Sequence, residues 1–405
     1  MERKEQILKY AEEIEENIIQ FRRLLHQHPE LSMKEYETSK RIAEELRRLP
    51  GMEVYTDLAG GTGVMGVLRG KLPGKCILLR ADIDALPVEE ENGLEFCSVN
   101  PGCMHACGHD AHASWVLGAA MILSQMQEAL PGTVKFVFQP GEEMGRGAKE
   151  MLEGDHILEN PRVDMAFAAH AWPSVEAGKI AIARRYAFGC PGAFSIVIKG
   201  KGGHGSWPHL AVNPIMVAGD ICTRLPRILS ERIDAVEPRV ISIGAIHAGV
   251  PGVGNVIPEE CTMNGTIRAT DMEVMKQLAA EIERVVKSCC DLSGAEYEYK
   301  SHIGMYGVEN DPAMTKLCLT AARKVLGGEN AYVIEKDNLG GENFSEYSRR
   351  VPAAYLYVGI RNEKLAKPFS LHSPEFMLDE SVLKKAAAVF AALIFEANES
   401  ADFAF

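Results

Sequence analysis

The sequence predicts an α/β fold with a smaller α+β domain inserted into it. In residues 1–186 short apolar strands alternate with helical segments, and the alternation returns in the C-terminal part, which is typical of a layered α/β domain. Around residue 187 the order changes to β-α-β-β-α, which is typical of a separate small α+β sandwich. We therefore predict a discontinuous α/β domain, residues 1–186 and 297–405, around an insertion of residues 187–296.

The N-terminal part begins with two predicted helices. Apolar residues at helical spacing predict the first over residues 5–27, and Pro29 ends it. Ser32 and Glu35 have the spacing of a capping box and predict a second helix that ends near Pro50. The next elements are four short apolar strands and a helix, over residues 63–68, 76–81, 133–138 and 165–169, and over residues 111–127.

The inserted part contains a glycine-rich turn, residues 200–206, after its first strand. Thr270 and Glu273 predict the cap of its second helix. Its predicted strands cover residues 192–199, 240–247, 260–268 and 297–301, and its helices cover residues 213–232 and 270–294. The chain then returns to α/β alternation, with a helix over 311–326, a strand over 353–358 and a closing helix over 381–397.

Composition limits the function classes. A formal net charge of -13 argues against a nucleic-acid or anionic-membrane partner. The 10 cysteines are scattered, which indicates a reducing compartment rather than a disulfide framework. The first residues lack the apolar core of a signal peptide, and no apolar run is long enough to span a bilayer. We expect a cytoplasmic protein.

A stretch crowded with histidines, residues 104–112, carries the strongest chemical signal. It contains Cys107 and His109, and Gly108 between them would let the backbone turn so that both side chains face one point. Thiolate, imidazole and carboxylate groups are the ligands of transition metals. Without paired Cys-x-x-Cys spacings, the pattern favours metal-activated water over a structural zinc clip. The alternatives are a buried cysteine beside a loop histidine, or a Cys107–His109 nucleophilic pair, which would leave the downstream glutamates without a role.

Glu142 and Glu143 follow a predicted buried strand and a Pro-Gly turn. Adjacent residues at a strand end point in different directions, so one glutamate can bind metal while the other moves protons. A solvated acidic turn is the alternative. His170 ends an apolar strand, whereas spacing alone does not link His372 to the site.

A run of charged residues ends another strand. Arg80, Asp82 and Asp84 can form structural ion pairs there, or hold metal ligands in place through hydrogen bonds. The sequence has no Gly-x-Ser-x-Gly elbow, no phosphate-binding loop and no dinucleotide fingerprint.

The ordered motifs resemble the zinc-peptidase-related amidohydrolases, a family that includes hippurate hydrolase, N-acyl-amino-acid deacylases and plant auxin-conjugate hydrolases. The resemblance covers nearly the whole chain. It rests on residues 25–32, 80–87, 104–110, 139–143, 202–209, 254–258, 265–268 and 371–374.

The resemblance implies a two-metal catalytic domain, with a mixed sheet flanked by helices, that is split by a lid and dimerisation domain. It implies Glu142 as the general base and His204 as a lid residue that assists the oxyanion, often at a neighbouring subunit's site. Asn255 and Arg268 would hold the substrate, and Asp84 and Asp110 would support the ligands. The metal ligands would be Cys107, His109, Glu143, His170 and His372.

Two departures from the pattern stand out. The family's peptidase branch has His and Asp where this chain has Asp82 and Asp84, which leaves the role of Asp82 open. Met144-Gly-Arg146 replaces the more usual run of glycines after the glutamates and could alter the rim of the pocket.

The implied activity is hydrolysis of N-acyl amino acids to a carboxylic acid and a free amino acid. The implied cofactors are two divalent transition-metal ions per chain, with zinc, manganese, nickel and cobalt as candidates. The implied assembly is a homodimer or a higher homo-oligomer through the lid. The rivals are a dipeptidase or carboxypeptidase with the same chemistry, and a non-catalytic ligand-binding protein with a relict site.

Overall fold

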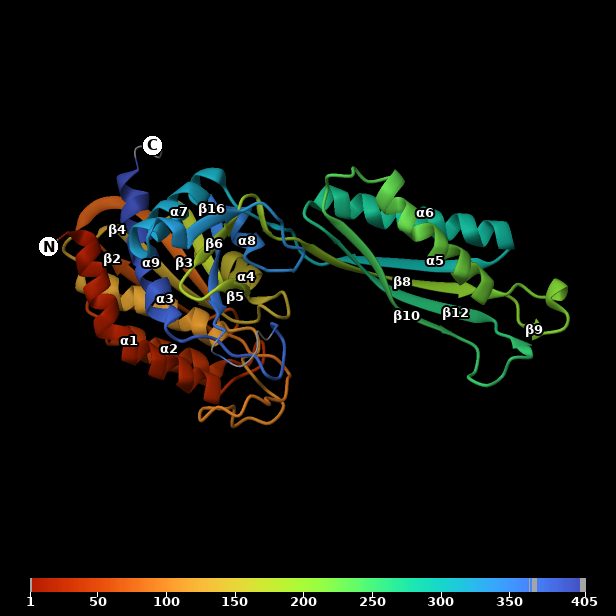
Figure 1. Cartoon of the computed structure of the whole chain (residues 1–405), viewed down its shortest axis with the longest axis horizontal. Helices are drawn as coiled ribbons and strands as arrows, with labels where there is room; N and C mark the ends of the chain where they lie inside the picture. Colours follow the sequence, from red (N-terminus) through yellow and green to blue (C-terminus); the bar gives the residue numbers. More distant parts are fainter. Residues whose placement is uncertain (1, 364, 366–369, 401–405) are drawn as a thin grey trace. The chain divides into compact units, whose positions relative to one another are not determined.

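The computed structural model describes residues 2–363, 365 and 370–400 and divides the chain into two compact units (Figure 1). Unit 1 comprises Met1–Ala187, Val308–Lys336 and Asn343–Phe405, and unit 2 comprises Phe188–Gly307 and Asp337–Glu342. Each unit has a hydrophobic core of its own.

Unit 1 is built on an eight-stranded sheet in the order β1-β2-β4-β3-β5-β16-β6-β15. β3 runs parallel to β4 and β5, and β16 runs parallel to β5, whereas β1, β2 and β4 pair antiparallel. The sheet is therefore mixed, as the resemblance implied. Its strands are β1 (Met52–Leu58), β2 (Gly63–Arg69), β3 (Leu72–Asp82), β4 (Pro131–Gln139), β5 (Met165–Glu176), β6 (Ile180–Ala183), β15 (Ala331–Ile334) and β16 (Ala353–Arg361).

Helices flank this sheet, which confirms the predicted fold class. The longer ones are α1 (Arg3–Gln27), α2 (Tyr36–Arg47), α3 (His109–Gln125), α7 (Pro312–Leu326) and α9 (Val382–Glu399). The short ones are α4 (Gly147–Lys149), a π-helix (Glu150–Gly154), a 3-10 turn (Gly328–Asn330) and α8 (Ser345–Ser348). α3 packs against α1 and α9 and is buried on all sides, which holds its N-terminus rigidly in the core.

The predicted capping box of the second helix is wrong. α2 begins at Tyr36, and its first N–H groups, from Glu37 and Thr38, donate to the Glu30 carboxylate. The Ser32 hydroxyl donates instead to Asp84 Oδ2 at 2.6 Å. The Glu35 carboxylate accepts from two main-chain N–H groups outside the helix. Both side chains are drawn into contacts distant in sequence, which local spacing does not reveal.

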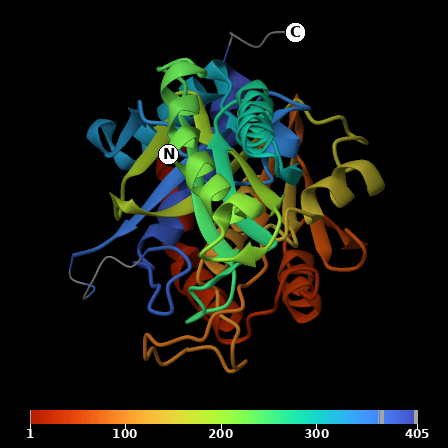
Figure 2. The same ribbon diagram turned by 90° about the vertical axis from the view of Figure 1, so that its right-hand side faces the viewer.

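Unit 2 is an α+β sandwich. Its four-stranded antiparallel sheet has the order β10-β12-β8-β13, and α5 and α6 pack side by side on it (Figures 1 and 2). β8 and β12 alternate buried and more exposed residues, as strands with one covered face do. Its main elements are β8 (Cys190–Lys199), α5 (Pro214–Glu231), β10 (Arg239–Ala248), β12 (Glu260–Ala269), α6 (Met272–Ser293) and β13 (Glu296–Ile303).

Shorter elements complete the chain. They are β7 (Tyr186–Phe188), β9 (Gly203–His204), a 3-10 turn (Pro208–Leu210), β11 (Val256–Ile257) and β14 (Val308–Glu309). The predicted cap of α6 needs correction, because Asp271, not Thr270, accepts from the N–H groups of Glu273 and Val274.

The predicted insertion boundary at residue 296 is too early. β13 pairs with β8 from Glu296↔Lys199 to Ile303↔Gly192, so this strand is part of the sheet of unit 2. A second stretch, residues 337–342, also belongs to unit 2, where Gly189 N donates to Gly340 O at 2.8 Å. Pairings between residues so far apart leave no local pattern in the sequence.

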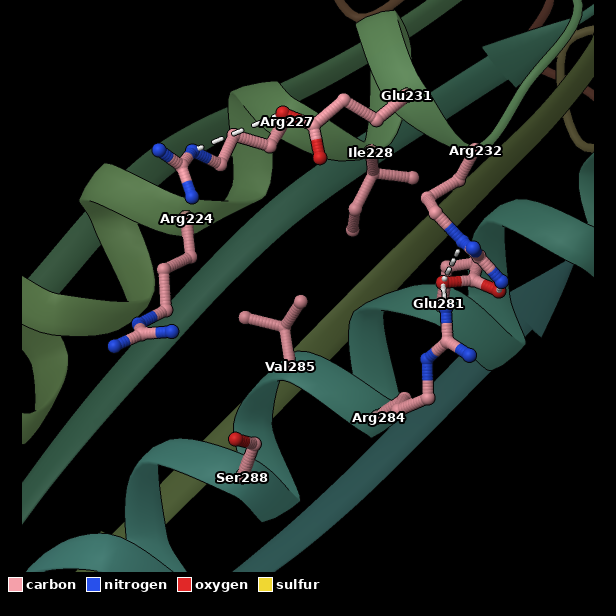
Figure 3. A pocket seen from close by; sticks show the side chains of 9 residues that line it. All are labelled: Arg224, Arg227, Ile228, Glu231, Arg232, Glu281, Arg284, Val285 and Ser288. Atoms are coloured by element: carbon pink, nitrogen blue, oxygen red, sulfur yellow. Dashed lines mark hydrogen bonds and ion pairs between the residues drawn. The ribbon is translucent and has the colours of Figure 1, made fainter.

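α5 and α6 border a groove of about 330 Å³ in unit 2 (Figure 3). Its apolar floor includes Ile228 and Val285. Glu281 accepts from both Arg232 and Arg284, so the groove is in part an ion-pair network that ties the two helices together. No predicted metal ligand lines it. In the described part of the chain, no helix has the length and apolar character needed to cross a membrane.

Candidate metal centre

The site lies where three parallel strands of unit 1 end their pairing. β3 pairs with β4 up to Asp82↔Gln139, and with β5 up to Arg80↔Ala168. Ligands of open α/β sheets bind outside the carboxyl ends of such strands. His170 lies just beyond the last pair with β3, although β5 continues to Glu176, so the prediction that this strand ends at His170 is wrong.

A tight turn aims the Cys107 and His109 side chains. Gly108 is the N-cap of α3 with φ +87°, in the left-handed region that glycine adopts without steric cost. A Cβ added there would lie 3.0 Å from the Cβ of Ala171. Cys107 and His109 are both buried, so their donor atoms have little access to bulk water.

Hydrogen bonds set the protonation of the two buried histidines. His109 Nδ1 lies 3.1 Å from Asp84 Oδ1, so this nitrogen carries the proton. His109 Nε2 is buried and has no hydrogen-bond partner among the described residues. His170 Nδ1 donates to the Ala171 carbonyl at 2.8 Å, which leaves the lone pair on Nε2, 3.4 Å from Cys107 Sγ. His109 thus presents an Nε2 without a hydrogen-bond partner among the described residues, and His170 directs its Nε2 toward the Cys107 thiol.

Glu143 and His372 add a second set of donor atoms. Glu143 N donates to Asp84 Oδ2 at 3.0 Å, and Glu143 Oε1 lies 3.4 Å from His372 Nε2. Glu143 Oε1 is buried without a hydrogen-bond partner in the described part of the chain. His372 N donates to the Ala106 carbonyl at 2.8 Å, which ties the C-terminal histidine to the loop that carries Cys107.

These donor atoms form overlapping groups whose members lie within 4.8 Å of one another. Among the described residues there are four such groups: Cys107–His109–His170, Cys107–Glu143–His372, His109–Glu142–Glu143 and Asp82–His109–His112. Buried polar atoms without partners are costly unless something binds them. The thiol, imidazole and carboxylate set with bare donor atoms therefore fits transition-metal ions.

Burial raises the pKa of the Cys107 thiol well above its usual range, against the opposing effect of nearby His109. Because thiolate is the metal-binding form, loading such a site would release a proton.

His112 lies near the same donors but is satisfied on both ring nitrogens. Its Nε2 accepts from Ala171 N at 2.9 Å, and its Nδ1 is bonded to Asp82 Oδ1. Asp82 also accepts from Arg80 Nη1 at 2.7 Å. Burial would raise the pKa of Asp82, but the neighbouring His109, His112 and Arg80 hold it well below its usual range. Asp82 thus lies between Arg80 and His112, and Asp84 between His109 and Glu143.

Asp110 contacts a different cluster from the one predicted. Its carboxylate lies 2.7 Å from Arg22 Nε and 2.8 Å from His26 Nδ1. Burial opposes ionisation, but the positive charges of Arg22 and His26 lower the pKa of Asp110. Successive residues of a helix point in different directions, so Asp110 faces away from the side of α3 that carries His109.

The remaining predicted residues lie in unit 2. His204, in β9, is opposite Val256 in β11, and Asn255 O accepts from Gly205 N at 2.8 Å, so His204 and Asn255 are close together. Arg268, in β12, donates from Nη1 to the carbonyls of Gly192 and Ile267 at 2.9 Å.

Sequence reasoning missed several residues that build the site. Asn343 N donates to Glu142 Oε1 at 3.1 Å, and Glu35 Oε1 accepts from Gly141 N at 2.9 Å in the turn before the glutamates. Ser32 reaches Asp84. Ser32 was within a recognised motif, which was a usable signal, whereas nothing in the sequence singled out Asn343.

Such a site on such a sheet defines a hydrolase of the metallopeptidase class. Residues 78–396 match the description of Peptidase family M20/M25/M40, and the chain belongs to that family. It is accordingly a hydrolase that acts on amide bonds.

The chain is 41% identical to thermostable carboxypeptidase 2 of Saccharolobus solfataricus, over 95% of this chain and 96% of that protein. It is 36% identical to N-acetylcysteine deacetylase of Bacillus subtilis, over 93% and 95%. Among solved structures, the Bacillus subtilis YXEP protein, described as a dinuclear metal binding peptidase, matches with a TM-score of 0.81 and 33% identity over 95% and 98%.

Proposed function

We propose that this protein hydrolyses N-acyl amino acids to a carboxylic acid and a free amino acid, with two divalent metal ions bound in unit 1. The observation that carries the proposal is the convergence of bare donor atoms around Glu142. The deacetylase relative supports the substrate class. The residues proposed to hold the ions are Cys107, His109, Glu143, His170 and His372.

Glu142 is the proposed general base. It lies in the same group as His109 and Glu143, so a water beside the ligands would be within its reach. When bound, the two ions would polarise the amide carbonyl and lower the pKa of a nearby water to about 7. Glu142 takes a proton from that water as the oxygen of the water bonds to the carbonyl carbon. Glu142 then gives the proton to the amide nitrogen as the C–N bond breaks.

Asp84 supports this arrangement by holding two ligands at once. It accepts from His109 on one oxygen, and from Glu143 N and Ser32 on the other. Such hydrogen bonds fix the orientation of a metal-binding imidazole and increase its basicity. The native metal is proposed to be zinc, manganese, nickel or cobalt, because affinity order does not decide occupancy in cells.

Unit 2 is proposed to act as a lid and as the dimerisation domain of a cytoplasmic homo-oligomer. His204 would stabilise the oxyanion, and Asn255 and Arg268 would hold the substrate. His204→Ala is expected to lower turnover without changing the metal content. If His204 acts across subunits, mixing this variant with Glu142→Gln protein restores activity once subunits have exchanged. If activity is not restored although the subunits have exchanged, His204 acts at the site of its own chain or has no role in catalysis.

A carboxypeptidase activity is the second candidate, favoured by the 41% identity to thermostable carboxypeptidase 2. The two reactions share their leaving group, an amino acid with a free carboxylate. They differ only in whether the acyl side is a simple acid or a peptide.

A ninhydrin screen of metal-loaded protein separates the candidates. The substrates are N-acetyl and N-benzoyl amino acids, N-blocked dipeptides and free dipeptides, with Glu142→Gln protein as the control for contaminating hydrolases. Faster release from the simple acyl compounds supports the first proposal, and faster release from the blocked dipeptides supports the second. A requirement for a free substrate amine would indicate a dipeptidase and overturn both.

A further inference from the structure

The general base is held by a main-chain group from a distant part of the sequence. Glu142 Oε1 accepts from Asn343 N at 3.1 Å. This bond fixes one oxygen of a side chain that would otherwise have several rotamers. The position of the Asn343 main chain therefore governs where the base points.

The Asn343 side chain is anchored in the core of unit 1. It is buried, and its Oδ1 accepts from Arg80 Nη2 at 2.8 Å and from Gln139 Nε2 at 2.9 Å. Arg80 Nε also donates to Gln139 Oε1 at 3.1 Å, so the three side chains form a closed set of hydrogen bonds. Gln139 is the last residue of β4, three residues before Glu142. The hydrogen bonds of Gln139 therefore support the chain that carries Glu142 as well as the side chain of Asn343.

The place of Asn343 in the chain explains why an anchor is needed. The chain passes from unit 2 into unit 1 between Glu342 and Asn343. A main-chain N–H at such a crossing has no helix or sheet ladder to fix it, because α8 begins only at Ser345. The buried contacts of Asn343 Oδ1 supply this restraint.

We propose that Asn343 is a positioning residue, which fixes the general base through its main-chain N–H, with Arg80 and Gln139 as its anchor. The inference rests on the proposed role of Glu142. It adds that the productive orientation of Glu142 depends on a side chain that touches neither substrate nor metal ligand.

Two substitutions test the anchor. Asn343→Leu keeps the branching of the side chain but has no acceptor, so kcat is expected to fall by about 10- to 100-fold, as displacements of a catalytic group do. KM and metal content should change little. Asn343→Asp keeps the acceptor, and Asn343 Nδ2 has no hydrogen-bond partner among the described residues, so this variant should retain kcat.

A double-mutant cycle shows whether the effect passes through the base. In the Glu142→Gln background, Asn343→Leu should cause no further loss of kcat, because residues that act as a unit are not additive. Asn310→Leu is the matched control. Asn310 is an equally buried asparagine of unit 1, bonded to Ala183 and Tyr355 main-chain groups, and its loss should lower the melting temperature without this coupling to Glu142.

Additive losses in the cycle, or full kcat in Asn343→Leu protein, would overturn the inference. If the wild-type protein does not hydrolyse N-acyl amino acids but hydrolyses blocked dipeptides, the cycle is run on the blocked dipeptides. The proposed substrate class would then be wrong, while the role of Asn343 would still be tested. A crystal structure of metal-free Asn343→Leu protein gives a readout independent of substrate. The Glu142 carboxylate should no longer accept from the N–H of residue 343, and an unchanged contact would contradict the proposal.

Discussion

Two buried polar clusters in unit 1 share the same short stretch of chain. The first, here called the ligand cluster, contains Cys107, His109, Glu143, His170 and His372. The second, called the ion-pair cluster, contains Arg22, His26, Glu90 and Asp110. His109 and Asp110 are adjacent in sequence, yet each belongs to a different cluster.

The clusters differ in how closely opposite charges approach one another. In the ion-pair cluster, Asp110 Oδ2 lies 2.7 Å from Arg22 Nε and 2.8 Å from His26 Nδ1, and His26 Nε2 lies 3.0 Å from Glu90 Oε1. In the ligand cluster, Glu143 Oε1 lies 3.8 Å from His109 Nε2 and 3.4 Å from His372 Nε2, and neither Glu143 Oε1 nor His109 Nε2 has a hydrogen-bond partner in the described residues. Donor atoms that surround one point at these longer distances leave room for an ion between them. The comparison teaches that the spacing of the charged atoms, rather than residue type, separates a binding site from a structural network.

The largest expected effect comes from the two adjacent glutamates beside the ligand cluster. Glu142→Gln is expected to reduce kcat by about 10²-fold or more, because it removes the proton acceptor. Metal content and folding should stay unchanged. Glu143→Gln should instead reduce the number of ions bound, because a neutral amide is a weaker metal ligand than a carboxylate. Steady-state kinetics and elemental analysis of the purified proteins give both quantities.

Comparing the two variants tests which glutamate is the base and which is the metal ligand. Metal loss in Glu142→Gln protein with retained metal in Glu143→Gln protein would exchange the two roles. Chelation should abolish hydrolysis in the unsubstituted protein, and a fully active metal-free preparation would contradict the use of metal altogether.

The ion-pair cluster should respond in the opposite way. Asp110→Asn removes the charge that faces Arg22 and His26, and breaking a buried ion pair costs about 3–5 kcal/mol. Urea denaturation of metal-free protein should show this loss, whereas the number of ions bound per folded chain should not change. Cys107→Ala is the converse variant, which should lose metal with a smaller effect on stability. Metal loss in Asp110→Asn protein would mean that the clusters are not independent.

The sequence predicted that the proposed ligands would lie near one another, as they do in the structure, but it predicted their surroundings less well. Cys107, His109 and the glutamates follow strand and turn signals, and the structure brings them together with His372, which spacing alone did not place. Asp110 was misplaced because a motif gives neighbours but not the direction in which each side chain points. Ser32 and Glu35 had a local interpretation as a capping box, but they make contacts to residues 84 and 141. The strand over residues 297–301 was predicted as part of the inserted sheet, but the domain boundary was set at residue 296, in front of it, because the pairing of β13 with β8, about a hundred residues earlier, leaves no local signal.

Glu35, which accepts from Gly141 N in the turn before the two glutamates, should make the stability of the protein depend on pH. Burial, followed by the nearby Asp84 carboxylate, raises the pKa of Glu35 to about 7 from its ordinary value of 4.5. Between these values the folded chain holds a proton that the unfolded chain releases, so the free energy of unfolding falls as pH rises through this window. Glu35→Gln is always neutral. Its stability relative to wild type should therefore improve by about 2 kcal/mol between pH 5 and pH 8.

Urea denaturation of chelator-treated protein at both pH values measures this change. The difference between the two pH values matters, because any constant cost of the new buried amide cancels. Glu37→Gln, at an exposed position two residues away, is the matched control and should show no such trend. A pH-independent difference between Glu35→Gln and wild type would contradict the prediction.

The smallest expected effect is at the edge of the ligand cluster. Ser32 donates to Asp84 Oδ2 at 2.6 Å, and the same oxygen accepts from Glu143 N at 3.0 Å. Ser32→Ala leaves that oxygen with one donor, so the expected loss of stability is about 1 kcal/mol, the net value of a typical hydrogen bond. Because Asp84 still holds His109, the metal content should stay unchanged and kcat should fall by less than about 10-fold. A loss as large as that of Asp110→Asn, measured by the same urea denaturation, would show that Asp84 depends on Ser32 for its position. The hydrogen bond from Ser32 would then contribute as much to stability as the buried ion pairs of Asp110 do.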